Sequence, residues 1–221
     1  MLRIRIAFKP AIRNIAILVG LMHAQQAFSQ SGTPALAGEY FLEGRMEVAS
    51  VLWLKADSTF QFFFSYGAMD RSGQGRWSYT DGHVALRSQP RPPKDFALTS
   101  KMSRSHAGTR FRVTDQNPML LSYVLVKAHT PNGVVEGRTD QKGYFVVASK
   151  QVNKVELLFE LCPERYSSYD LGRENDYEFR FEPWISEIFF ESFKLRHESN
   201  ILTGPHPLLE GDNFRFVKGT L

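Results

Sequence analysis

The stretch Tyr177-Glu178-Phe179-Arg180-Phe181-Glu182 alternates aromatic and charged side chains residue by residue. Successive side chains of a β-strand point to opposite faces, so this pattern predicts a strand with one buried and one wet face. Shorter stretches of the same kind are Phe111-Arg112-Val113, Val155-Glu156-Leu157 and Phe214-Arg215-Phe216. We therefore predict an all-β protein built from antiparallel sheets.

Glycines and prolines separate these runs at short intervals, which is typical of strands joined by tight turns. No stretch after the first 29 residues shows apolar spacing of three and four residues over three turns, so long amphipathic helices are not expected. The predicted sheets form a β-sandwich or a barrel, in one unit or in two packed β units. Periodicity does not determine which strands pair, so these alternatives stay open.

The first 29 residues have the organisation of a signal peptide. Basic residues at positions 3, 5, 9 and 13 precede an apolar run from Ile15 to Met22, and Ala27-Phe28-Ser29 places small residues before a cut ahead of Gln30. A membrane anchor would need about 18 or more apolar residues, and this run is shorter. No later window is long and apolar enough to span a bilayer. We predict an exported protein, periplasmic or extracellular, with a bacterial source preferred.

The charge of the chain is balanced once this leader is set aside. The full sequence has 27 Lys and Arg residues against 23 Asp and Glu, and the part after residue 29 has 23 of each. This balance gives no electrostatic reason to expect nucleic acid or an anionic membrane surface as a partner.

Two β units are predicted after the leader. Residues 35–98 form a Phe-rich unit, and the prolines at 90, 92 and 93 mark its edge because proline is excluded from central strands. Residues 109–221 form a second unit, a sandwich to which the C-terminal strands are added. Within the first unit, Asp57 is predicted to be a hairpin residue.

The segment Gly137-Arg138-Thr139-Asp140-Gln141-Lys142-Gly143-Tyr144-Phe145 lies between alternating strands. Asp140 can cap a turn here, and Gly143 can supply a positive φ before the next strand. Over about residues 109–160 the chain resembles the regulatory module of carboxypeptidases, a transthyretin-like β-sandwich. The resemblance implies a non-catalytic accessory or adhesion module and carries no catalytic residues.

The N-terminal segment is similar to the start of small lipocalin-like barrels. The residues that carry this likeness are Gly38-Glu39-Tyr40, then Asp57-Ser58-Thr59-Phe60, then Gly75-Arg76-Trp77. The resemblance implies a barrel that carries a small apolar ligand.

The aromatic residues of the first unit are its strongest compositional feature. Phe60, Phe62 and Phe64 share one strand face and Phe63 lies on the other, which predicts a strand buried on both faces. The same pattern could line a cavity for an apolar ligand. The predicted ligand-binding residues are Phe62, Phe64, Tyr66, Asp70 and Trp77. Asp70 is interpreted as the end of a turn or as a polar group at a pocket mouth.

The tryptophans at 53, 77 and 184 could be exposed stacking platforms for sugars, but their apolar strand contexts favour the core. Cys162 is the single cysteine and follows an apolar run, so a buried thiol near a strand end is predicted. The basic residues between 101 and 112 suggest a mildly positive linker exposed to solvent.

No catalytic, metal or cofactor site is predicted. Gly-x-Ser-x-Gly is absent, the histidines are widely separated, and no phosphate-binding glycine loop is present. A pair of carboxylates could cleave glycosides, and the candidates are Glu39, Glu43, Glu47, Asp57 and Asp70. The preferred function is non-enzymatic binding or envelope structure with a protein partner. The alternatives are a carrier of a small apolar ligand and, less favoured, a carboxylate-dependent hydrolase.

Overall fold

The computed structural model describes residues 36–219, and the predicted signal peptide lies outside the described residues. The described chain is nearly all β, which confirms the predicted fold class. Both predicted arrangements are present, because one part of the chain closes into a barrel and another forms two facing sheets.

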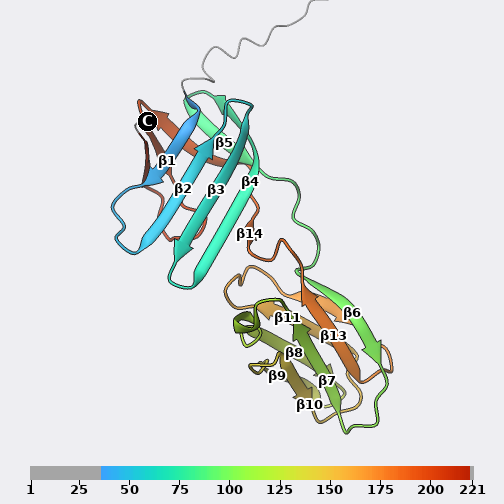
Figure 1. Ribbon diagram of the computed structural model, residues 1–221. Coiled ribbons are helices and arrows are strands. Elements are labelled where there is room, and N and C mark those ends of the chain that lie inside the picture. Colours follow the sequence, from blue (N-terminus) through green and yellow to red (C-terminus); the bar gives the residue numbers. More distant parts are fainter. Residues whose placement is uncertain (1–35, 220–221) are drawn as a thin grey trace, which may run out of the picture. The chain divides into compact units, whose positions relative to one another are not determined.

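Eight antiparallel strands form the closed barrel. They are β1 (Gly38–Leu42), β2 (Val48–Leu54), β3 (Thr59–Tyr66), β4 (Met69–Thr80), β5 (His83–Arg87), β15 (Phe193–Glu198), β16 (Ile201–Gly204) and β17 (Phe214–Lys218). Each strand pairs with the next along the chain, β5 pairs with β15, and β17 pairs with β1 to complete the circle. Figure 1 shows the blue to green first strands and the red last strands in the same barrel. The short strand β14 (Glu187–Ile188) pairs in parallel with β4.

The barrel interior is filled by aromatic and aliphatic side chains. Tyr40, Phe60, Phe62 and Phe216 are almost completely buried there. Gly73 on β4 leaves room for the Phe190 ring, because a Cβ at residue 73 would lie 2.6 Å from that ring. Burying rings of this size removes a large apolar area from water and dominates the energy of a small core.

The segment between β5 and β14 forms two four-stranded sheets. One has the order β10-β7-β13-β6 and the other β12-β11-β8-β9. The strands are β6 (Phe96–Met102), β7 (Thr109–Thr114), β8 (Val124–Thr130), β9 (Gly133–Arg138), β10 (Tyr144–Val147), β11 (Lys154–Phe159), β12 (Ser167–Asp170) and β13 (Asp176–Phe181), with a short 3-10 helix η1 (Pro118–Leu120). Both sheets contribute to one core, so this part is a β-sandwich with its own interior.

The turn before β10 has the geometry predicted for it. Asp140 Oδ1 accepts hydrogen bonds from the backbone N–H groups of Lys142 and Tyr144, each at 2.8 Å. Gly143 has a φ of 80°, in the left-handed region that favours glycine. Asp57 likewise accepts a bond from the Thr59 backbone N–H at 2.9 Å, and the Thr59 hydrogen bonds lower the pKa of its carboxyl. These two turn predictions are confirmed.

The strand pairing differs from the predicted division of the chain. We predicted a unit over residues 109–221, but β15 to β17 are strands of the barrel and β14 pairs with the barrel strand β4. The first unit was predicted to reach residue 98, whereas β6 already pairs within the sandwich. Alternation shows that a segment is a strand but does not show its partner, and β1 finds its partner β17 at the opposite end of the chain.

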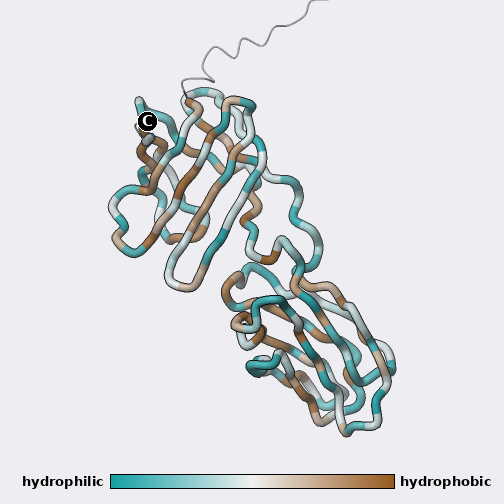
Figure 2. The backbone as a smooth tube through the Cα atoms, viewed as in Figure 1, coloured by the Kyte–Doolittle hydropathy of each residue, from teal (hydrophilic) through white to brown (hydrophobic). Residues whose placement is uncertain are grey.

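Residues 88–95 connect β5 to the sandwich and contain the three clustered prolines. Figure 2 shows this connection mostly in teal and white, in contrast to the brown residues along the strands. Within residues 36–219 no helix is long and apolar enough to cross a membrane.

Candidate functional site

The outer face of the barrel carries large apolar side chains in cross-strand register. Phe41 on β1 lies opposite Val51 on β2, and Val51 lies opposite Phe63 on β3. Directly opposite residues of antiparallel strands have side chains on the same face, about 5 Å apart. Trp53, two residues after Val51, extends this group along β2. We call Phe41, Val51, Trp53 and Phe63 the apolar band.

The band is open to solvent. Phe63 is 49% exposed, Phe41 44% and Trp53 39%. An aromatic side chain buries about 150–250 Å² when it is fully covered, so the three rings together leave a few hundred Å² of apolar surface in water. Contiguous apolar surfaces of that size are among the largest on a typical folded protein and are often functional.

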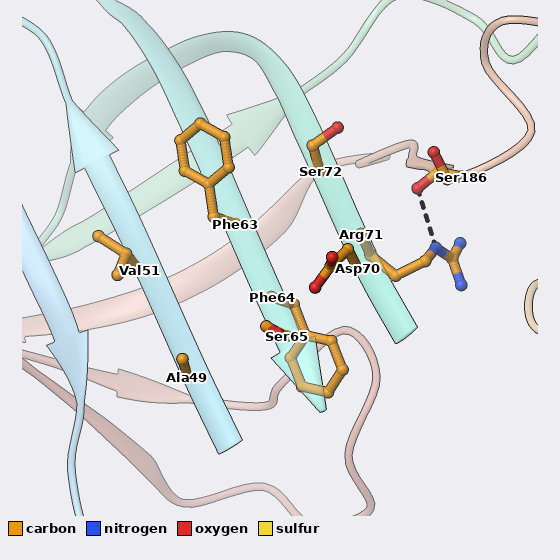
Figure 3. Close-up of a pocket in the computed structure, with 9 residues that line it drawn as sticks. All are labelled: Ala49, Val51, Phe63, Phe64, Ser65, Asp70, Arg71, Ser72 and Ser186. Carbon is orange, nitrogen blue, oxygen red and sulfur yellow. Dashed lines mark hydrogen bonds between the residues drawn. The ribbon is translucent and has the colours of Figure 1, made fainter. Parts of the chain in front are cut away.

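A shallow hollow of about 400 Å³ adjoins the band (Figure 3). Its lining residues come mainly from β2, β3 and β4: Ala49, Val51, Phe63, Phe64, Ser65, Asp70, Arg71, Ser72 and Ser186. The side chains at 49, 65 and 72 are small, whereas Phe63 beside them is large. This contrast in size forms the hollow.

Asp70 supplies the negative charge of the hollow. It lies opposite Ser65 in the β3–β4 hairpin, and its side chain is exposed. Its carboxylate makes no hydrogen bond or ion pair with residues 36–219. In Figure 3 this carboxylate lies on the β3 side of β4.

Arg71 follows Asp70 on β4 and points the other way. Successive residues of a strand alternate between faces, and the Arg71 side chain is buried. Its Nε donates a hydrogen bond to the Ser186 carbonyl oxygen at 2.9 Å, drawn as a dashed line in Figure 3. The guanidinium therefore does not neutralise Asp70 on the outer face.

The structure separates the predicted ligand-binding residues into two groups. Phe62, Phe64 and Trp77 are buried in the barrel interior, and only Phe64 also reaches the hollow. Tyr66 and Asp70 are exposed on either side of the β3–β4 turn. Asp70 thus lines a hollow, as the interpretation of a polar group at a pocket mouth requires.

The interior rings pack against one another. The Phe190 ring centroid lies 5.2 Å from that of Phe60 and 5.5 Å from that of Phe62, both in edge-to-face contact. The Trp77 indole N–H donates to the Lys55 carbonyl oxygen at 2.9 Å. These contacts account for the burial of the interior residues without a ligand.

A serine and a histidine also meet inside the barrel. Ser50 Oγ and His206 Nε2 are 3.1 Å apart, and both residues are buried. The Leu208 backbone N–H donates to His206 Nδ1 at 3.1 Å, so Nδ1 carries no proton in the neutral ring. The proton therefore lies on Nε2, which donates to Ser50. A histidine in this tautomer cannot accept the serine proton, so the pair is not arranged as a nucleophile and its base.

The carboxylates considered for glycoside cleavage do not meet at the hollow. Asp70 is the one carboxylate among the described residues that line it, whereas that reaction needs two facing one cleft. Within residues 36–219 no group of three or more His, Cys, Asp or Glu side chains is placed to hold a metal ion.

Cys162 is buried in the sandwich core, as predicted. Burial raises the pKa of its thiol to about 11, which keeps the thiol protonated at neutral pH. The basic residues between 101 and 112 are not a free positive patch. Lys101 pairs with Glu174 at 3.5 Å, Arg112 pairs with Glu178 at 3.2 Å, and Arg110 pairs with Asp176.

The sequence did not identify the apolar band. Trp53 was predicted to be a core residue and the other face of β3 was predicted to be covered, and both predictions are wrong. Apolar residues on both faces of β2 and β3 were the available signal, but that pattern also fits a strand between two layers. Trp77 is buried as predicted, and Trp184 is partly buried with its indole N–H donating to the Lys94 carbonyl oxygen.

No family model, curated protein or solved structure matches this chain. The resemblances to the carboxypeptidase regulatory module and to lipocalin-like barrels therefore stay predictions.

Proposed function

We propose that this protein is an exported, non-enzymatic binding protein of the cell envelope that recognises a partner protein through the apolar band and the adjoining hollow. The observation that carries this proposal is the exposure of three rings on one sheet face: Phe41 and Phe63 lie on either side of Val51, and Trp53 lies two residues further along β2. The exposed part of these rings gives the fold no hydrophobic stabilisation, and covering it with a partner would be favourable.

Two further features support the proposal. The leader-like organisation of residues 1–29 favours export, and the sequence resemblance of about residues 109–160 to an accessory module favours a role without catalysis. The hollow is lined by one carboxylate, and the buried Ser50–His206 pair has the wrong tautomer for nucleophilic chemistry. Binding therefore fits the described side chains better than hydrolysis does.

Site-specific photocrosslinking in the producing cell tests the proposal. A photoreactive amino acid at position 63 and, separately, at position 41 should yield the same crosslinked partner. The matched control is position 78, because Ser78 is exposed on the outer side of β4 but lies about 20 Å along the strand from Ser72, the residue opposite Phe63. Equal crosslinking at all three positions, or none at 41 and 63, would contradict the proposal.

The carrier hypothesis is the second candidate, and the observation that favours it is the closure of eight strands into a barrel. The mutual packing of the interior rings favours a filled core instead. Native mass spectrometry of the protein purified from its own compartment separates the two: a stoichiometric apolar adduct would support the carrier, and a clean apo mass would remove it.

A further inference from the structure

The chemistry of the hollow specifies the partner more closely. Covering the apolar band also covers Asp70, because Phe63, Ser65 and Asp70 lie on the same face of neighbouring strands. Burying a carboxylate away from water without a hydrogen-bond or ion-pair partner is strongly unfavourable. A purely apolar partner surface would leave Asp70 in that state, and an acidic surface would repel it.

Within residues 36–219 no cationic side chain pairs with the Asp70 carboxylate. The outward positions that line the hollow on β2, β3 and β4 carry Ala49, Ser65 and Ser72. Arg71 also lines the hollow, but its guanidinium is directed away from Asp70 to the Ser186 carbonyl oxygen (Figure 3). The missing cation has to come from the partner. A lysine or arginine can place its aliphatic stem on apolar surface and its charged end on a carboxylate.

We infer that the hollow receives a lysine or arginine side chain of the partner protein, with an apolar neighbour of that side chain resting on Phe63 and Val51. Asp70 is the counter-charge, and the small residues at 49, 65 and 72 provide the space. The inference rests on the proposed function and names the chemistry of the partner segment. The hollow has a volume of about 400 Å³, near the lower end for small-ligand sites, and this size suits one or two side chains of a docking segment.

Three labelled peptides of 12 residues test the inference in fluorescence anisotropy with the full mature chain. The probe alternates valine and lysine, a second peptide alternates valine and glutamate, and a third alternates serine and lysine. We expect the valine–lysine peptide to bind about tenfold or more tightly than either of the others, because it alone offers both apolar contact and a cation. The preference should weaken with added salt, since part of it is an ion pair at the surface.

Two variants with matched controls locate the binding. Asp70→Asn should weaken the valine–lysine peptide by about fivefold or more. Asp81→Asn is the control, because Asp81 is an exposed carboxylate on the same barrel with a φ of 49°, which asparagine tolerates. Phe63→Ser should also weaken binding, with thermal unfolding confirming that each variant is folded.

The outcomes separate this inference from the proposed function. If Phe63→Ser weakens the peptide but Asp70→Asn does not, the cationic partner is wrong and the apolar site stands. If neither variant has an effect, both proposals fail for this peptide class. Equal losses in Asp70→Asn and Asp81→Asn would show non-specific attraction and overturn the inference. Sedimentation of the chain without peptide completes the test. A dimer that forms in the wild type and is lost in Phe63→Ser would show that the apolar band binds a second copy of this chain.

Discussion

Phe62 and Phe63 are neighbours on β3 and have opposite environments. Phe62 is buried among the rings of the barrel, whereas Phe63 is half exposed on the outer face. Residue type is the same in both, so the difference comes from closure of the sheet, which gives each strand an inside and an outside. The inner phenylalanines account for stability, and the outer ones are available for recognition.

The strongest test of this difference is the change Phe62→Ala. Removing a buried ring leaves a cavity beside Phe190 and His206, so we expect a loss of about 3–5 kcal/mol in the free energy of unfolding. Urea unfolding measures it. A loss below about 1 kcal/mol would show that the interior is loosely packed and would revive the carrier hypothesis.

The pH dependence of stability gives the second test of the inner face. Burial, with a smaller contribution from Arg45, lowers the pKa of His206 to about 4, from 6.5 in an exposed histidine. The unfolded chain therefore binds more protons between these values, and stability should fall by up to about 3 kcal/mol as the pH drops from 6.5 to 4. Below pH 4 this contribution stays constant.

The variant His206→Gln isolates the contribution of this histidine. Glutamine keeps a donor and an acceptor but does not titrate, so the difference between variant and wild type should be constant above pH 6.5 and narrow towards pH 4. A difference independent of pH across this window would show that His206 is not buried in its neutral form.

A smaller effect is expected for Ser50→Ala. The change leaves the His206 Nε2–H without its described partner inside the barrel. A buried donor left unpaired costs about 1–3 kcal/mol, and the alanine fits the site without strain. Thermal and urea unfolding should agree on the loss. No change at all would imply that water satisfies His206 from the barrel mouth.

The smallest effect on stability should come from Phe63→Ser. The ring is already half exposed, so the loss is limited to its contact with Val51 and to strand propensity, and the free energy of unfolding should fall by about 1 kcal/mol or less. Loss of the crosslinked partner without loss of stability would complete the contrast with Phe62→Ala. A large loss of stability would instead place Phe63 in the core and weaken the proposed function.

Strands, turns and burial could be predicted from the sequence where they depend on residues close together in the chain. The strand alternation at 177–182, the turn formed by Asp140 and Gly143, and the buried Cys162 all follow from side chains within a few positions of one another. These predictions do not depend on which distant strands pair.

The rest depends on long-range pairing. The register that aligns Phe41, Val51 and Phe63 follows from three adjacent strands, and the partner of β1 is the last strand of the chain. His206 meets Ser50 across a separation of 156 residues. Side chains within a few positions of each other carry no information about such pairs, so the barrel boundaries, the apolar band and the buried histidine were missed.

The barrel takes its first five and its last three strands from opposite ends of the described chain, with the whole sandwich between them. Until residues 193–218 are present, β1 and β5 have open edges that invite pairing with other chains. Contacts this far apart in sequence form slowly, because a long loop must close before they are gained. The strands of the sandwich are contiguous in the chain, so the sandwich can form first. Its formation shortens the loop because it brings residues 95 and 182 together, where the Glu182 N–H donates to the Asp95 carbonyl oxygen at 3.0 Å. Folding of the sandwich therefore assists closure of the barrel, and barrel closure is expected to be the last and slowest step in the folding of the chain.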